Sequence, residues 1–262
     1  MIIILFITIM LLLYWYDIYK TKSSSCCSYT LENYENNIIF LSKNELEDIL
    51  TKDSDNYYSR FYNSDLMARR TPNITEYKEK IKQNADDFTE KEKERIKNIV
   101  NQLDNKIKNI SFPWFDGNKC SSIPWKFGLI DGSDYESGLS HTRYDTIIFS
   151  RHTLSHKTDS SFAKTLLHEK AHVYQKLYPN DVEIYINMNN FKKIRKRSES
   201  DMIRANIDTD DWIYVDKNNI EYKSVYYNNK PYSLSDVYYN PCNEQKCEHP
   251  YEKMAIEISE KI

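Results

Sequence analysis

The chain has 262 residues, enough for one well-buried globular domain with appendages or at most two small domains. Its 36 basic and 39 acidic residues leave a net charge of −3, which argues against a general nucleic-acid-binding surface, so no nucleic acid is expected as a partner. The 22 tyrosines and 4 glycines reflect a compositional bias and indicate no mechanism.

The first sixteen residues, MIIILFITIMLLLYWY, carry no charge. An apolar helix over residues 1–19 would span about 28 Å, close to the hydrocarbon thickness of a bilayer. We therefore predict a single-pass transmembrane anchor over residues 1–20, with a cleaved signal peptide or a buried core helix as alternatives. Lys20 and Lys22 favour the cytoplasmic side only weakly, so the side of the membrane stays open.

Residues 21–40 are polar and rich in serine, which predicts a tether between the membrane and the folded body. A helical N-terminal region is expected over residues 41–112. Capping-box patterns begin at Ser42 and Thr89, and apolar residues recur at spacings of three and four through residues 96–110. Whether this region is a lid, an inhibitory segment or a docking surface is left open.

Aromatic and β-branched segments at residues 124–130 and 145–150 predict strands of a mixed sheet. Helices are expected over residues 160–177 and 181–194, followed by a hairpin of residues 212–215 and 220–227 and by a helix that opens at Pro250. We interpret the basic cluster at residues 192–197 as the charged end of the second helix. This order predicts an α+β domain over residues 113–262.

The five cysteines leave two questions open. Cys242 and Cys247 bracket a short loop and form either a disulfide or a pair of free thiols. Cys26 and Cys27, just beyond the apolar segment, are either acylated or free.

The segment TLLHEKAHVYQKLYP, residues 165–179, contains the pattern H-E-x-x-H. On a helix, positions i and i+4 lie on one face, so the imidazoles of His168 and His172 can reach one Zn²⁺ ion. Glu169 then lies beside the metal, where it can act as general base toward a metal-activated water. Two histidines that only share a helix face would not explain this glutamate.

A hydrolytic zinc site needs a third protein ligand. We predict Glu252, in the first turn of the helix that opens at Pro250, where Ala255 permits close packing against the histidine helix. Alternative third ligands are His249, Glu248 and Glu257. No G-x-x-H continuation of the metzincins follows His172.

The motif HEKAH followed by Glu252-Lys-Met-Ala255 resembles the gluzincin type of zinc metallopeptidase, in which two histidines and a downstream glutamate bind the metal. The phrases GLSHTRYDTIIFS, RANIDTDDWIY and EHPYEKMAIE are similar to zincin-like proteins of large DNA viruses. The resemblance covers the chain from Gly128 onward. It implies a zincin-like metallopeptidase domain with one bound zinc ion, a peptide substrate, and a virion or host membrane as the location of the anchor.

Zincins commonly bind substrate along an edge strand, and the resemblance places DTIIFS, residues 145–150, in that position. Five residues are candidates for contacting substrate or stabilising the transition state. They are His141, Arg143, Arg204, Tyr238 and Tyr239. For Arg204, an ion pair with Asp208, Asp210 or Asp211 is the competing structural role.

These observations predict a membrane-anchored zinc metallopeptidase, and we expect it to be an endopeptidase. The competing hypothesis is a membrane-tethered structural or interaction protein that keeps the zincin scaffold without turnover. A zinc hydrolase of non-peptide amides is a third possibility.

Overall fold

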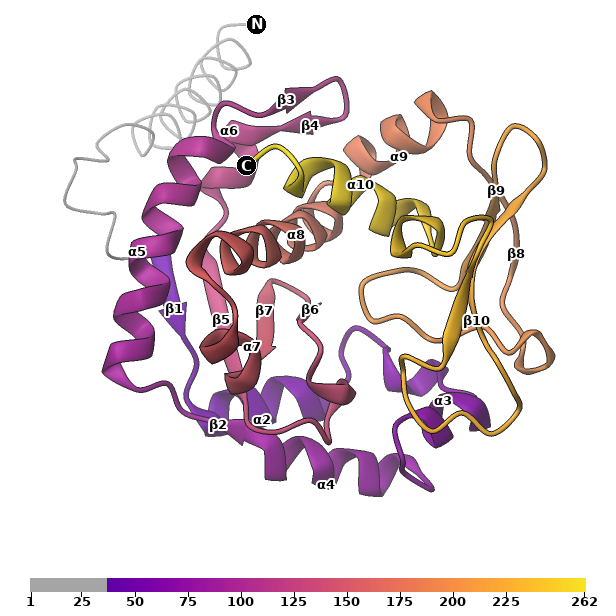
Figure 1. Cartoon of the computed structure of the whole chain (residues 1–262), viewed down its shortest axis with the longest axis horizontal. Helices are drawn as coiled ribbons and strands as arrows, with labels where there is room; N and C mark the ends of the chain where they lie inside the picture. Colours follow the sequence, from indigo (N-terminus) through magenta and orange to yellow (C-terminus); the bar gives the residue numbers. More distant parts are fainter. Residues whose placement is uncertain (1–36) are drawn as a thin grey trace, which may run out of the picture. The chain divides into compact units, whose positions relative to one another are not determined.

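A computed structural model describes residues 37–262 (Figure 1). The predicted anchor over residues 1–20, the cysteine pair at 26 and 27, and most of the predicted tether over residues 21–40 lie outside the described residues. Among residues 37–262, no helix combines the length and the apolar character that a membrane crossing requires.

A mixed five-stranded sheet forms the centre of the fold, in the order β1-β5-β7-β6 with β2 paired to β5. β1, β5 and β7 run parallel, whereas β6 is antiparallel to β7 and β2 is antiparallel to β5. The strands are β1 (Ile38–Phe40), β2 (Ala85–Asp86), β5 (Trp125–Ile130), β6 (His141–Arg143) and β7 (Thr146–Ser150). The strands expected at residues 124–130 and 145–150 are confirmed as β5 and β7.

Helices cover both faces of this sheet because side chains alternate along each strand. Phe127 of β5 packs in the core that contains α5 (Glu90–Ile107) and α8 (Asp159–Leu177). Ile148 of β7 packs in a second core with α2 (Lys43–Lys52) and α4 (Ile74–Asn84). α2 approaches β5 closely at Gly128, where a Cβ atom would lie 2.5 Å from Leu46 Cδ1.

The helical region after β1 begins as the sequence indicates. Both expected capping boxes are confirmed: Ser42 caps α2 with Glu45, and Thr89 caps α5 with Glu92. β1, at the end of the segment expected as a tether, and β2, within the helical region, both pair with β5, so the sheet crosses the boundary expected near residue 112. Residues 38–262 form one compact unit.

A second sheet is antiparallel, in the order β11-β10-β9-β8. Its strands are β8 (Lys192–Lys196), β9 (Trp212–Val215), β10 (Glu221–Tyr226) and β11 (Val237–Asn240). The expected hairpin is confirmed as β9 and β10, which pair Glu221 with Val215 and Tyr222 with Tyr214.

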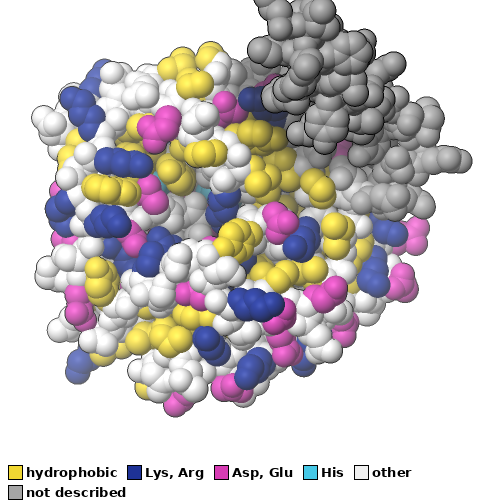
Figure 2. All heavy atoms as spheres, turned by 180° about the vertical axis from the view of Figure 1, so that it is seen from behind, with side chains coloured by type: hydrophobic (Ala, Val, Ile, Leu, Met, Phe, Trp, Pro, Cys, Tyr) yellow, Lys and Arg dark blue, Asp and Glu magenta, His cyan; other side chains and the backbone are white. Residues whose placement is uncertain are grey.

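The helix expected over residues 181–194 is wrong in its second half. α9 (Pro179–Met188) stops before Asn190, which takes a left-handed conformation with φ of 58° and turns the chain into β8. Residues 192–196 of the basic cluster therefore lie on an exposed edge strand and not at a helix end, whereas Arg197 is buried and paired with Asp65 and Asp211. Lysines on a sheet edge discourage pairing with other chains. Basic and acidic side chains are interspersed on the face that Figure 2 shows.

The remaining elements are short or lie near the C-terminal helix. The short α-helices are α3 (Asn63–Ala68), α6 (Gly117–Ser122) and α7 (Arg151–His156). A two-stranded sheet pairs β3 (Ser111–Phe112) with β4 (Phe115–Asp116). 3-10 turns cover η3 (Tyr58–Arg60), η4 (Glu136–Gly138), η5 (Glu199–Asp201) and η6 (Gln245–Cys247), and the last helix is α10 (Pro250–Ser259).

Candidate metal centre

The H-E-x-x-H segment lies in α8, whose extent agrees with the expected helix over residues 160–177. Thr158 caps α8 by accepting a hydrogen bond from the backbone of Ser161. Lys170, within the motif, points away from the two histidines into the core, where its Nζ donates to the carbonyl oxygens of Ile123 and Pro124. Burial lowers the pKa of Lys170 to about 8. These buried contacts hold α8 in the rotation that presents His168 and His172 on the other side.

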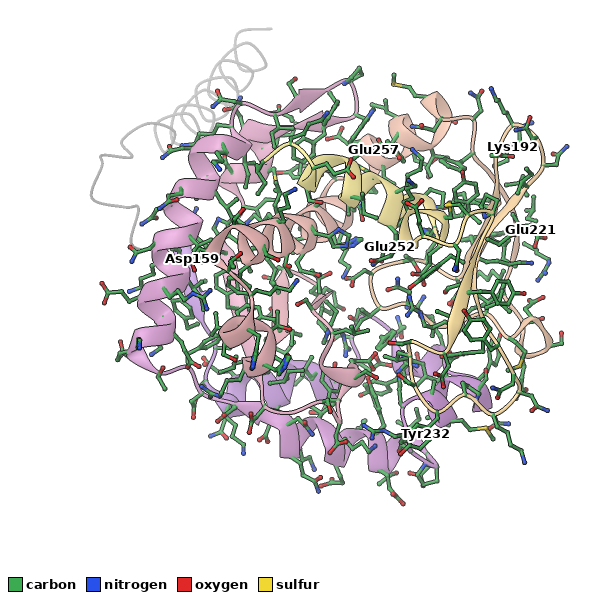
Figure 3. The ribbon with its side chains drawn as sticks, in the orientation of Figure 1. Asp159, Lys192, Glu221, Tyr232, Glu252 and Glu257 are labelled. Atoms are coloured by element: carbon green, nitrogen blue, oxygen red, sulfur yellow. A yellow bond between two sulfur atoms is a disulfide. The ribbon has the colours of Figure 1, made fainter. Side chains whose placement is uncertain are left out.

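α10 packs against α8 and supplies Glu252 (Figure 3). Pro250 occupies its first turn as expected, and the preceding residue His249 caps it by accepting from the backbone of Tyr251. His249 Nε2 also lies 3.1 Å from Asp210 Oδ1. Both ring nitrogens of His249 are thus engaged in holding the start of α10, and this alternative ligand does not join the motif histidines.

The side chains of His168, His172 and Glu252 converge so that one ligand atom from each lies within 4.8 Å of the others. The two Nε2 atoms are 3.1 Å apart, and Glu252 Oε2 lies 3.3 Å from His168 Nε2 and 3.8 Å from His172 Nε2. Ligand atoms about 2.0 to 2.2 Å from a tetrahedral zinc ion are about 3.3 to 3.5 Å apart. The donor set therefore fits Zn²⁺ in chemistry and in spacing.

Gln175 orients one of these histidines. His172 Nδ1 lies 2.9 Å from Gln175 Oε1, and Gln175 Nε2 donates to the carbonyl oxygen of Tyr251 at 2.9 Å. Because Gln175 Nε2 is the donor group, its oxygen accepts from Nδ1–H, which leaves a lone pair on His172 Nε2 that could bind a metal ion. The same amide joins α8 to the first turn of α10. A hydrogen-bonded partner of this kind is typical of metal-binding histidines.

Both carboxylate oxygens of Glu252 are held in place. Asn206 Nδ2 donates to Oε1 at 2.7 Å, and Gln245 Nε2 donates to Oε2 at 2.9 Å. Burial would raise the pKa of Glu252, but the charges and hydrogen bonds of His172 and His168 hold it well below the ordinary value. Gln245 lies in a loop closed by a disulfide between Cys242 and Cys247, which answers the question that the sequence left open for this pair.

Glu169 is 4% exposed, and within the described part of the chain its Oε2 has no hydrogen-bond partner. Burial raises its pKa well above the ordinary value, and the neighbouring carboxylates of Asp208 and Glu252 act in the same direction. A carboxylate with a free oxygen and a raised pKa accepts a proton readily. Glu169 thus has the properties of a general base next to the converging ligands.

A cavity of about 80 Å³ adjoins these residues. It is lined by His168, Glu169 and Glu252, by His141 and the pair of Arg69 and Glu136, and by the segment of residues 204–208, which we call the covering loop. Asn206 of this loop contacts Glu252, and Asp208 contacts Thr142 of β6. The covering loop therefore connects the ligand set to the edge of the central sheet.

The expected substrate-binding edge is not DTIIFS. That segment forms β7, an inner strand, and β6 is the edge strand beside it. The outward groups of β6 are already bonded: Thr142 N–H donates to Asp208 Oδ1 at 3.0 Å, and Lys176 Nζ donates to the Thr142 carbonyl oxygen at 2.9 Å. Asp208 and Lys176 occupy the positions at which a substrate backbone would pair with this edge.

Of the further candidates, His141 and Arg204 line the cavity. The guanidinium of Arg204 binds Glu248 at 2.6 Å, so its expected pairing with Asp208, Asp210 or Asp211 is wrong. The reason is that β10 and η6 bring Glu248 beside Ser224 and the start of the covering loop, a contact that residue spacing does not reveal. Glu248, an alternative ligand, therefore binds Arg204 and Ser224 and does not join the two histidines.

The other candidates lie outside the cavity lining. Arg143 is buried against Asp53 and Asp55, with its Nη2 2.5 Å from Asp55 Oδ1. Tyr238 is 41% exposed, and the ring of Tyr239 lies beside the Arg204 guanidinium. Glu257, the last alternative ligand, pairs with Lys253 on the surface of α10.

The residues that hold the ligands in place were not expected from the sequence. Gln175 follows His172 by three positions on α8, and that spacing is the signal that could have found it. Asn206 and Asp208 belong to the phrase RANIDTDDWIY, whose acidic and amide residues are dense enough to suggest a polar site. No signal in the sequence pointed to Gln245.

No protein-family model matches the chain, and neither the curated proteins nor the solved structures include a significant match.

Proposed function

We propose that this protein is a zinc-dependent hydrolase of the gluzincin type that cleaves peptide bonds, with His168, His172 and Glu252 as zinc ligands. The observation that supports it most is the convergence of these ligand atoms within 4.8 Å, next to a buried glutamate whose Oε2 is unpartnered among the described residues. Gln175, Asn206 and Gln245 orient the ligands, as metal sites require.

A zinc ion held by His168, His172 and Glu252 would supply Lewis acidity toward a substrate carbonyl and would favour ionisation of water at neutral pH. Glu169 takes a proton from the attacking water through its free Oε2. The water oxygen bonds to the carbonyl carbon, the bond from that carbon to nitrogen breaks, and Glu169 transfers the proton to the leaving amine. The buried surroundings keep Glu169 a strong base during the first transfer and an acid during the second.

Metal content of the purified full-length protein, measured by mass spectrometry, tests the ligand set. Wild type and Glu169→Gln are expected to hold one zinc ion each, because Glu169 is not a ligand. His168→Ala and Glu252→Ala are expected to lose it while remaining folded. The matched controls are His152→Ala, an exposed histidine of α7, and Glu257→Gln, the glutamate that Lys253 pairs on α10; both should keep the metal.

Peptide-library cleavage followed by mass spectrometry then tests turnover. Wild type is expected to cleave, and zinc-loaded Glu169→Gln is expected to lose at least 100-fold in rate, since general base catalysis contributes about 10²- to 10⁴-fold. Folded wild type that takes up no zinc would contradict the proposal as a whole.

One observation favours a second candidate, a zinc-binding scaffold without turnover. The edge of β6 is bonded to Asp208 and Lys176, and the cavity of about 80 Å³ is small for an extended peptide. Zinc uptake without cleavage of any library peptide would favour this scaffold role over the hydrolase.

A further inference from the structure

His141, which lines the cavity beside the proposed zinc site, has a ring nitrogen without a hydrogen-bond partner among the described residues. The side chain lies at the start of β6, only 2% of the residue is exposed, and it forms part of the cavity lining together with Glu169. Its Nε2 atom has no hydrogen-bond partner among the described residues. A buried polar atom without a partner is unfavourable, so such an atom calls for an explanation.

The other ring nitrogen determines what Nε2 can do. His141 Nδ1 lies 2.9 Å from the carbonyl oxygen of Leu139. A carbonyl oxygen can only accept, so Nδ1 carries the proton of this hydrogen bond. In the neutral ring Nε2 is then a hydrogen-bond acceptor.

The surroundings favour the neutral ring. Burial lowers the pKa of His141, although the carboxylates of Glu136 and Asp208 act in the opposite direction. Both carboxylates already have cationic partners: Arg69 binds Glu136 at 2.8 Å, and Lys176 lies 3.4 Å from Asp208. The charge of Arg143 also disfavours an imidazolium.

Two residues that line the cavity, His141 and Glu169, thus each have a buried polar atom, Nε2 and Oε2, without a hydrogen-bond partner among the described residues. Glu169 has a use in the proposed reaction, whereas His141 has none. A ligand that satisfies both must bring hydrogen-bond donors. An amide substrate carries such a donor, its N–H group, and an ester does not.

We propose that His141 is a substrate-positioning residue whose Nε2 accepts a hydrogen bond from a substrate N–H in the cavity. This inference rests on the proposed hydrolase function, because it assumes that substrate occupies the cavity next to the metal. It makes amides with an N–H group the substrate class and disfavours esters and N-alkylated amides of the same shape.

Two small zinc-binding probes test the inference without turnover. Acetohydroxamate carries an N–H group, and N-methylacetohydroxamate binds metals through the same two oxygens but has none. Their affinities for zinc-loaded full-length protein are measured by titration calorimetry. We expect wild type to bind acetohydroxamate about tenfold more tightly, the effect of one hydrogen bond to a buried acceptor.

Variants separate the hydrogen bond from the bulk of the added methyl group. His141→Leu should keep its zinc and bind both probes with affinities within about twofold of each other, whereas His141→Gln, which offers an oxygen acceptor, should restore part of the difference. His156→Leu, an exposed histidine of α7, is the control and should retain the wild-type ratio.

Equal affinities in wild type, or a difference that survives in His141→Leu, would overturn the role of His141 and leave the zinc hydrolase proposal standing. If zinc-loaded wild type binds neither probe, both proposals fail, because the metal is then closed to ligands.

Discussion

Gln175 is the residue on which the geometry of the metal centre depends most after the ligands themselves. Its amide accepts from His172 and donates to the backbone of Tyr251, so one side chain fixes both a ligand and the start of the helix that carries the third ligand. An isolated H-E-x-x-H match lacks such a partner, and two histidines without it would be free to choose either tautomer.

Gln175→Leu should therefore weaken zinc binding while α8 and α10 remain folded. The loss expected for a hydrogen-bonded partner of a metal-binding histidine is about 10- to 100-fold in affinity. Competition with a chromophoric chelator measures it. Gln102→Leu, on the exposed face of α5, is the matched control and should keep wild-type affinity; an unchanged affinity in Gln175→Leu would show that His172 needs no such support.

At this scale the sequence predicted the residues that have a defined spacing and missed those that do not. His168, Glu169 and His172 follow from helical geometry, and Glu252 from the need for a third ligand. The contacts of Asn206 and Gln245 with Glu252 could not be predicted, even though the residues around Asn206 suggest a polar site, because each side chain reaches Glu252 from a loop whose path depends on the second sheet.

At the scale of elements, the site lies where α8 packs against α10, and the loop closed by the disulfide contacts Glu252 through Gln245. The loop carries Gln245 in η6, and the disulfide between Cys242 and Cys247 restricts the positions that this turn can adopt. Its integrity should influence both the stability of the chain and the position of Glu252.

We expect the double variant Cys242→Ser, Cys247→Ser to be less stable by about 2 kcal/mol, the value for a loop of this length, and to bind zinc more weakly. Thermal unfolding and chelator competition measure the two effects. Treatment of wild type with a phosphine reductant should reproduce both losses and leave the double variant unchanged. If the reductant lowered the stability and zinc affinity of the double variant by the same amounts, its effect on wild type would not come from this disulfide.

The strands and helices that were predicted correctly have signals within their own residues, such as the capping boxes of α2 and α5. The helix expected over residues 181–194 failed because its second half has helical periodicity but pairs with β9. Pairing with a strand distant in sequence decides whether such a segment forms a helix or a strand. Asparagine adopts the left-handed conformation more readily than most residues, so Asn190 was a local indication that the helix ends there.

At the scale of the whole molecule, a buried ion pair joins distant segments around the cavity. Arg69 binds Glu136 through two nitrogens, and its Nη2 also donates to the carbonyl oxygen of Ala205 in the covering loop at 3.1 Å. Tyr57 and Tyr77 donate to the same carboxylate. Segments before β5, after β5 and after β8 are thereby held together.

This pair should make stability depend on acid. Burial would raise the pKa of Glu136, but Arg69 lowers it below the ordinary value. A lowered folded-state pKa contributes stability that is complete above about pH 4.3, the ordinary value in an unfolded chain, and is lost as the pH falls through the folded-state pKa. Wild type should therefore become less stable below about pH 4.3.

Glu136→Gln should cost about 3 to 5 kcal/mol at pH 7, because it leaves the buried Arg69 without its nearest charged partner. It should also show a shallower decline in stability below about pH 4.3. Denaturant unfolding at several pH values measures both. Glu79→Gln, which removes an exposed partner of Lys82, should change stability by less than about 1 kcal/mol. A parallel pH profile in Glu136→Gln would contradict the assignment.

The order in which the chain is made has a consequence for the metal centre. Glu252 follows His172 by 80 residues, so a ribosome that adds about 5 to 20 residues per second makes the third ligand about 4 to 16 s after the second. During this interval a nascent chain offers two histidines but not the complete donor set. If the proposed site binds zinc, tight uptake would therefore wait until translation has passed α10 and all three ligands are present.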